Sequence, residues 1–319
     1  MRAAFALLAL SLAAAGCGRS QAGAPVTLQF WAMGREGEIV RELCAQFERS
    51  RPGVKVEVQQ MPWTAAHEKL LTAYVGQETP DLVQLGNTWV PELASIRALE
   101  PLDARMATSR AIRREDYFAG IWDTNVVDGA LWGVPWYVDT RLLFYRTDVL
   151  SQAGWPAPPR TWDEWLRAMR DVKRRGGSRY AIVLPTDEWA QPVILGLQQG
   201  SPILRDGGRY GAFAAPEFRR GAEFYVRLFH EDLAPKSNNA EIANVYNQFL
   251  RGDFAMYITG PWNIGEFRRR LPEDFRSRWT TAPLPTPDPA GTWPGVSLAG
   301  GASLAIFATS RHKDEAFAL

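Results

Sequence analysis

Cysteine and histidine, which build many metal and nucleophile sites, are scarce: the 319 residues include 2 Cys and 3 His. His67-Glu68 begins a run like that of zinc proteases, but Leu71 stands where that motif requires its second histidine. The sequence also has no P-loop, no GxGxxG motif and no paired CxxC motif. We therefore predict no metal site and no cofactor.

A serine nucleophile is not indicated either. Gly301-Ala302-Ser303-Leu304 is followed by Ala305 rather than by glycine, so the motif of a nucleophile elbow is incomplete. A glycoside hydrolase needs only two carboxylates, and the chain has 35 Asp and Glu residues. The sequence predicts a protein that is not an enzyme, with a secreted glycoside hydrolase left open as the alternative.

A net excess of charge is absent as well, because 36 Lys and Arg residues stand against 35 Asp and Glu residues, a net charge of +1. Such a chain has no overall field to attract nucleic acid, so we expect no nucleic-acid partner. Its length is about twice that of a typical domain, and 46% of the residues are hydrophobic. Two separately packed cores are therefore expected.

The N-terminus predicts export. After a basic residue, the apolar run Ala3 to Ala15 is shorter than the about 20 residues that span a bilayer, and it is typical of a secretory signal. Gly16 before Cys17 resembles a bacterial lipobox, although Ala14 stands where leucine is usual. We expect cleavage before Cys17, lipidation of Cys17 and a tether over residues 18–25, which would anchor the protein in the periplasm or at the cell surface. Simple cleavage and an uncleaved anchor remain alternatives.

The second cysteine, Cys44, lies in an apolar pattern of helical spacing. With Cys17 lipidated, no disulfide within the chain remains. We predict that Cys44 is a small buried hydrophobic residue.

The first third of the chain alternates strands with helices. The apolar spacing predicts strands at 26–31, 54–60 and 81–85, with a helix after the first strand and another over 64–75. Such a βαβαβ order is typical of a parallel sheet covered by helices.

The rest of the chain adds further helices and strands. Thr161 and Glu164 form a capping-box pattern at the start of a helix. We predict helices at 216–230 and 240–251 and strand-like passages at 134–145, 254–258, 280–284 and 298–308. A last helical pattern over 312–319 stops without a glycine or proline signal, so we expect the chain to be truncated.

Aromatic residues are abundant, with 13 Trp, 9 Tyr and 15 Phe, and many follow predicted strands. Their flat faces suit sugar rings. Four passages, taken in order, resemble the extracellular solute-binding proteins of family 1, the maltose- and trehalose-binding type: Leu28 to Gly34, Thr79 to Trp89, Leu131 to Arg146, and Phe249 to Asn263 with its Gly260-Pro261-Trp262.

The resemblance implies a two-lobed periplasmic-binding-protein fold of type II, an α/β fold in which each lobe is a mostly parallel sheet flanked by helices. Lobe 1 would comprise residues 26–137 and 286–311. Lobe 2 would comprise residues 138–285 and 312–319, without the further C-terminal helices that family members usually carry. A ligand would lie in the cleft between the lobes.

The resemblance also implies the ligand-binding residues. Tyr137 and Asp139 would put a ring and a carboxylate into the cleft, and Arg141 is an alternative ion partner of Asp139. Gly300 and Gly301 resemble a glycine pair that precedes a ligand-facing residue, although Ala302 follows where tryptophan is common. The remaining candidates follow predicted strands or start predicted helices: Trp31, Arg35, Glu36, Trp63, Asn87, Thr88, Trp89, Trp189, Trp262 and Asn263.

The resemblance implies that the protein delivers a solute to the permease subunits of an ABC importer, and we expect it to act as a monomer. The several aromatic faces favour a di- or oligosaccharide over a monosaccharide. A polyol or glycerol phosphate is the alternative ligand, and a phosphate would require more arginine in the loops.

Overall fold

The computed structural model describes residues 25–242, 244–288 and 290–319. The predicted signal, Cys17 and almost all of the predicted tether lie outside these residues. In the part that is described, no helix is both long and apolar enough to cross a bilayer.

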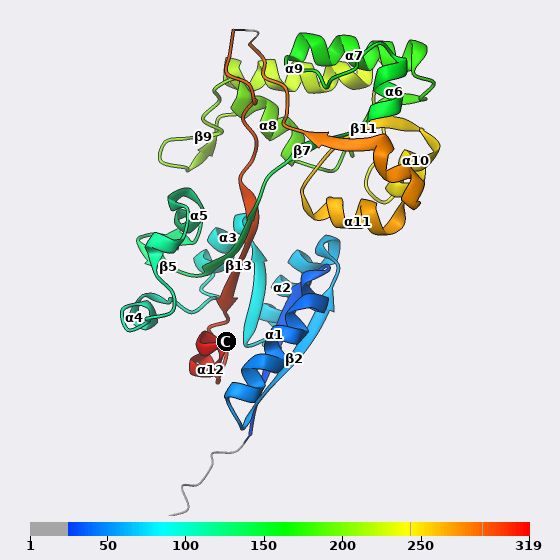
Figure 1. Ribbon diagram of the computed structural model, residues 1–319. Coiled ribbons are helices and arrows are strands. Elements are labelled where there is room, and N and C mark those ends of the chain that lie inside the picture. The colour runs from blue at the N-terminus through cyan, green and yellow to red at the C-terminus, as the bar shows by residue number, and fades with distance from the viewer. Residues whose placement is uncertain (1–24, 243, 289) are drawn as a thin grey trace, which may run out of the picture.

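The chain forms two α/β lobes, as predicted, and Figure 1 shows them one above the other, joined by extended strands. Lobe 1 is built on a sheet with the strand order β2-β1-β3-β13-β6, and lobe 2 on a sheet with the order β12-β7-β11-β8. In each sheet one strand is reversed and all the others run in the same direction, so the prediction of mostly parallel sheets is confirmed. The reversed strands are β13 in lobe 1 and β7 in lobe 2, each of which is antiparallel to both of its neighbours.

Lobe 1 starts with the predicted βαβαβ unit, in which β1 pairs in parallel with both β2 and β3. Its core is packed on both faces of the sheet, and Cys44 is buried on one of them with a thiol pKa raised to about 11 by burial. Its elements are β1 Val26–Met33, α1 Glu36–Ser50, β2 Val54–Met61, α2 Trp63–Gly76, β3 Leu82–Gly86, η1 Asn87–Trp89, α3 Val90–Ser95, α4 Asp103–Met106, η2 Arg114–Asp116, α5 Ala119–Asp123, β4 Val126–Val127, β5 Ala130–Leu131, β6 Val134–Asp139, β13 Gly300–Ile306 and α12 Lys313–Ala318.

Lobe 2 is also packed on both faces of its sheet. The predicted capping box is confirmed, since Glu164 N donates to Thr161 Oγ1 over 3.2 Å at the start of α7. Its elements are β7 Leu142–Arg146, α6 Thr147–Gln152, α7 Trp162–Arg175, β8 Tyr180–Val183, α8 Ala190–Gln198, β9 Leu204–Arg205, β10 Tyr210–Gly211, α9 Pro216–His230, α10 Val245–Arg251, β11 Phe254–Thr259, α11 Trp262–Arg270, η3 Glu273–Arg278 and β12 Trp279–Ala282.

The predicted lobe limits need three corrections, the first of which is that β6 extends lobe 1 to Asp139. Residues 312–319 belong to lobe 1, because the chain has already returned there through β13 and Ala316 of α12 is buried in the lobe 1 core. Residues 286–288 and 290–298 belong to lobe 2, since Thr286 N donates to Arg160 O over 2.9 Å and Leu298 packs on the lobe 2 core.

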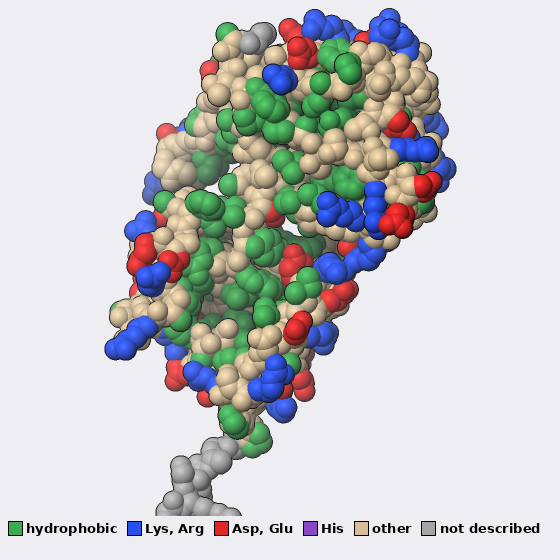
Figure 2. All heavy atoms as spheres, viewed as in Figure 1, with side chains coloured by type: hydrophobic (Ala, Val, Ile, Leu, Met, Phe, Trp, Pro, Cys, Tyr) green, Lys and Arg blue, Asp and Glu red, His purple; other side chains and the backbone are tan. Residues whose placement is uncertain are grey.

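The two connections between the lobes are tied to each other. One runs from β6 through Arg141 to β7, and the other runs from β12 to β13 through Ser297. Arg141 N donates to Ser297 Oγ over 3.2 Å, and Ser297 Oγ donates to Arg141 O over 2.9 Å. The crossing is therefore one hydrogen-bonded unit, and Figure 2 shows a hollow beside it between the lobes.

Candidate functional site

The end of β6 places a carboxylate and a phenol where the chain leaves lobe 1. Asp139 Oδ1 accepts a hydrogen bond from Arg141 Nη1 over 2.9 Å, and only 14% and 16% of these side chains are exposed. Burial raises the pKa of Asp139, although the neighbouring Arg141 guanidinium opposes that rise, and Glu36 raises it further. Asp139 thus binds Arg141 through one carboxylate oxygen, and its side chain lies in a largely buried environment of low dielectric constant.

The Tyr137 hydroxyl belongs to the same polar group. Gln84 Nε2 donates to it over 3.2 Å, and Gln84 Oε1 accepts from the backbone N of Met33 over 2.7 Å. Burial raises the pKa of Tyr137, and the Glu36 carboxylate raises it further. Gln84 is fully buried, so it holds Tyr137 from inside the lobe. The sequence did give a signal for Gln84, as the single polar side chain within Leu82–Leu85.

Gly300 and Gly301 make the close approach of β13 to β6 possible. Gly300 pairs with Asp139, and a Cβ atom at Gly300 would lie 2.6 Å from Asp139 Oδ1. Gly301 has φ +133°, and a Cβ atom there would overlap the Tyr137 carbonyl oxygen. The glycines leave room for the residues of β6, and Ala302 after them is buried rather than ligand-facing.

Two tryptophans form an aromatic wall on lobe 1. The rings of Trp63 and Trp89 are 5.5 Å apart and tilted by 56°, and both side chains are half-buried. Ring atoms of both residues lie within 4 Å of a Cβ built at Gly86, at the carboxyl end of β3. We call Trp63 and Trp89 the lobe 1 wall.

The other candidates of lobe 1 divide into buried and exposed side chains. Trp31 is 9% exposed and packs in the core, with Lys69 Nζ 4.6 Å from its ring centroid, so we correct its assignment from ligand-facing to core. Asn87 Nδ2 donates to Thr124 Oγ1 over 3.4 Å, while its Oδ1 is buried without a partner among the described residues. Thr88 is exposed.

Lobe 2 contributes two exposed tryptophans. Trp262 is 46% exposed and Trp189 is 50% exposed, at the starts of α11 and α8. The Trp262 ring folds back over Gly260, where a Cβ atom would overlap it. Arg141 Cζ lies 4.6 Å from the Trp262 ring centroid, so Arg141 connects Asp139 with Trp262.

Asn263 has a structural role, which corrects its assignment to the ligand. Its side chain is 6% exposed. Asn263 Nδ2 donates to Thr259 Oγ1 over 2.7 Å, and Asn263 Oδ1 accepts from the Tyr246 hydroxyl over 2.7 Å. Both polar groups of Asn263 are thus used to fix α11 on lobe 2.

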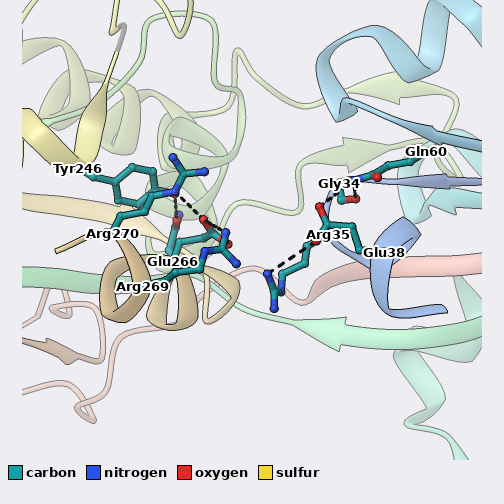
Figure 3. A network of polar contacts seen from close by, with 9 residues as sticks. Gly34, Arg35, Glu38, Gln60, Tyr246, Glu266, Arg269 and Arg270 are labelled. Carbon is teal, nitrogen blue, oxygen red and sulfur yellow. Dashed lines mark hydrogen bonds and ion pairs between the residues drawn. The ribbon is translucent and has the colours of Figure 1, made fainter. Parts of the chain in front are cut away.

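Charged side chains of the two lobes face each other beside this site. Figure 3 shows Arg35 of lobe 1 pointing toward α11 of lobe 2, where Glu266, Arg269 and Arg270 form one ion-pair group. Arg35 Nη1 is 3.9 Å from Glu38 Oε2 of its own lobe. The predicted residue Arg35 thus lies on the rim of the cleft (Figure 3), and no motif in the sequence marks its counterparts on α11.

The chain is similar to binding proteins of known type. The family model described as "Bacterial extracellular solute-binding protein" matches residues 32–319. The chain is 48% identical to the solved sugar-binding protein MalE from Xanthomonas citri, with a TM-score of 0.77 over 92% of this chain and 73% of that one.

Two curated relatives extend the comparison. An uncharacterized lipoprotein of Streptomyces antibioticus is 28% identical over 99% of this chain and 71% of its own length. The diacetylchitobiose binding protein DasA of Streptomyces coelicolor is 26% identical over 90% of this chain and 67% of its own length.

Proposed function

Because the chain belongs to the family of bacterial extracellular solute-binding proteins, we propose that it captures a di- or oligosaccharide between its lobes and delivers it to the permease of an ABC importer. The sugar-binding protein MalE and the diacetylchitobiose binding protein are the relatives that support a sugar. In this proposal the protein holds its ligand without transforming it.

The observation that carries the proposal is the pairing of aromatic faces with a carboxylate at the crossing. The lobe 1 wall and Trp262 offer apolar faces from the two lobes, and Asp139 lies where the chain passes between them. Sugar rings have an apolar C–H face and a rim of hydroxyl donors, which match ring faces and a carboxylate acceptor. Asp139 and Trp262 are linked through Arg141, so one ligand would engage both lobes at once.

The charges favour a neutral sugar over a phosphate-bearing solute. Burial raises the pKa of Asp139, and the negative charge of Glu36 raises it further. Arg141 is the cation paired with Asp139. A phosphate would face both carboxylates, and like charges in a low-dielectric site repel strongly.

A ligand screen tests the proposal. The protein is melted with maltose, maltotriose, lactose, diacetylchitobiose and glycerol phosphate, since a ligand that binds the native state raises the melting temperature. We expect a rise with at least one sugar and none with glycerol phosphate. Chromatography of the sugar after incubation should recover it unchanged, and released product would instead support a glycoside hydrolase.

We further propose that Cys17 carries a lipid that holds the protein at the membrane, and that the protein acts there as a monomer. Gly16 before Cys17 supports this, as does the similarity to a lipoprotein of Streptomyces antibioticus. Mass spectrometry of detergent-extracted protein should find a mature chain that begins at an acylated Cys17. A chain that begins elsewhere without a lipid would refute the anchor and leave export intact.

A further inference from the structure

His67 lies next to the lobe 1 wall and contacts Trp89. Trp63 and His67 are four residues apart on α2, so they occupy the same face of that helix. The Trp89 ring contacts both, with its centroid 5.5 Å from that of Trp63 and 5.2 Å from that of His67. Trp89 is therefore packed against two rings that lie one helical turn apart.

A hydrogen bond runs beside this ring contact. His67 Nε2 lies 2.6 Å from Glu92 Oε2, and Glu92 belongs to α3, three residues after Trp89. Helix α2 thus contacts the η1–α3 segment in two ways. Its two rings pack on Trp89, and His67 forms a hydrogen bond with Glu92.

The hydrogen-bonded pair of His67 and Glu92 is accessible to water, so we do not expect it to contribute much to the stability of the fold. The His67 and Glu92 side chains are 35% and 46% exposed, and pairs this accessible to water stabilise a fold little. Trp89 itself ends η1, a single 3-10 turn of three residues, whose hydrogen-bond geometry is poorer than that of an α-helix. The Trp89 ring therefore depends on its neighbours for its orientation.

We propose that His67, held by Glu92, is a positioning residue that fixes the orientation of the Trp89 ring in the lobe 1 wall. The inference rests on the proposed function, in which this wall contacts the ligand. His67 acts through Trp89 and Glu92 acts through His67. With the ring held before the ligand arrives, less conformational entropy is lost on binding.

The first test needs no ligand. Two indole rings in tilted contact give a coupled far-ultraviolet circular-dichroism signal, which Trp63→Phe assigns to the pair by abolishing it. In the full chain, His67→Ala and Glu92→Ala should weaken this signal. Glu92→Gln should retain it, because the amide oxygen still accepts from His67. His230→Ala, on the exposed end of α9, is the matched control and should leave it unchanged.

The second test measures binding of maltotriose by calorimetry. His67→Ala and Glu92→Ala should each lower the affinity about two- to tenfold while the melting temperature stays near that of the wild type. Glu92→Gln should bind like the wild type.

An unchanged circular-dichroism signal in His67→Ala would overturn the inference, as would equal losses in Glu92→Gln and Glu92→Ala. If the wild type binds no sugar, the proposed function fails, and the circular-dichroism comparison still decides whether His67 positions Trp89.

Discussion

The aromatic residues on the two sides of the cleft differ in how they are held. On lobe 1, Trp63 and Trp89 contact each other, and His67 contacts Trp89 as well. On lobe 2, Trp189 and Trp262 are 50% and 46% exposed, and neither contacts another ring in the described part of the chain. Lobe 1 therefore offers a pre-organised face, whereas lobe 2 offers apolar area that is still to be buried.

This difference assigns separate tasks to the lobes. A sugar can settle on the lobe 1 wall without reordering it, which limits the entropy lost on binding. Covering Trp262 requires lobe 2 to approach, so the closed state gains contacts that the open state lacks. A ligand shifts such an equilibrium only by its additional contacts in the favoured state.

The largest effect on affinity is expected for Trp262→Ala. Removing a central aromatic anchor commonly costs about 2 kcal/mol of binding free energy, or roughly 30-fold in affinity. The melting temperature should hardly change, because the exposed Trp262 supports no lobe core. Calorimetric titration and thermal melting of the same protein measure both quantities.

Trp63→Ala is the matched variant on lobe 1. It should lose affinity and stability together, because Trp63 also supports Trp89. The comparison between the lobes would be broken by a wild-type affinity with a collapsed melting temperature in Trp262→Ala, since that pattern belongs to a core residue, whose truncation costs about 3–5 kcal/mol of stability.

A smaller loss is expected for Asp139→Asn. A hydrogen bond to a charged group contributes about 1.5–3 kcal/mol, and the asparagine amide still accepts a hydrogen bond, so the loss of sugar affinity should be at the lower end, about tenfold. Glu266→Gln, on α11 at the rim, serves as a control for general charge effects and should change affinity far less. Equal affinities of Asp139→Asn and the wild type in calorimetry would remove Asp139 from the ligand site.

The ionisation of Asp139 should also make sugar affinity depend on pH, with a smaller effect than the substitution Asp139→Asn. Burial raises the pKa of Asp139 in the folded protein, so its contribution to stability is present at low pH and is lost as pH rises through the raised pKa. Ligand binding has the opposite sign, because the ligand needs the ionised acceptor. Titrations in mildly acidic buffers should show affinity falling a few-fold as pH drops through the raised pKa, above the usual Asp value of about 4. Asp139→Asn should show no such fall, and a parallel fall in both proteins would assign the effect to another group.

Asn263→Ala should change affinity least. It leaves the Tyr246 hydroxyl and Thr259 without their buried partner, which costs about 1–3 kcal/mol of stability. Thermal melting should record that loss, while calorimetry below the melting temperature should give nearly the wild-type affinity. A large selective loss of affinity would return Asn263 to the ligand site.

Much of the fold was predictable from local patterns. The helix Pro216–His230 was predicted with its observed bounds, and the capping box at Thr161 was identified from residue types alone. These signals depend on residues that are close in the sequence, so they predict the helix whatever the tertiary structure around it. The position of the one reversed strand in each sheet was not predictable, because β7 and β13 pair with strands that are distant in the sequence.

The sequence predicted which types of residue form the site, but it did not predict which of those side chains are exposed to a ligand. Trp31 and Trp262 looked alike, as tryptophans next to predicted strands, yet one is 9% exposed and the other 46%. Sequence spacing does not show which ring a neighbouring helix will cover. Asn263 was misassigned for a related reason, since its partners Tyr246 and Thr259 meet it only in the folded lobe.

The central claim, that a sugar is held between the lobes, is tested most directly by small-angle scattering with the sugar that stabilises the protein most. The radius of gyration of the wild type should fall at saturating sugar, because a ligand bound to both lobes favours their closed arrangement. At the same sugar concentration, Trp262→Ala should contract less, since it has lost its lobe 2 contact. A wild-type protein that is saturated with sugar by calorimetry and keeps its unliganded radius would contradict capture between the lobes.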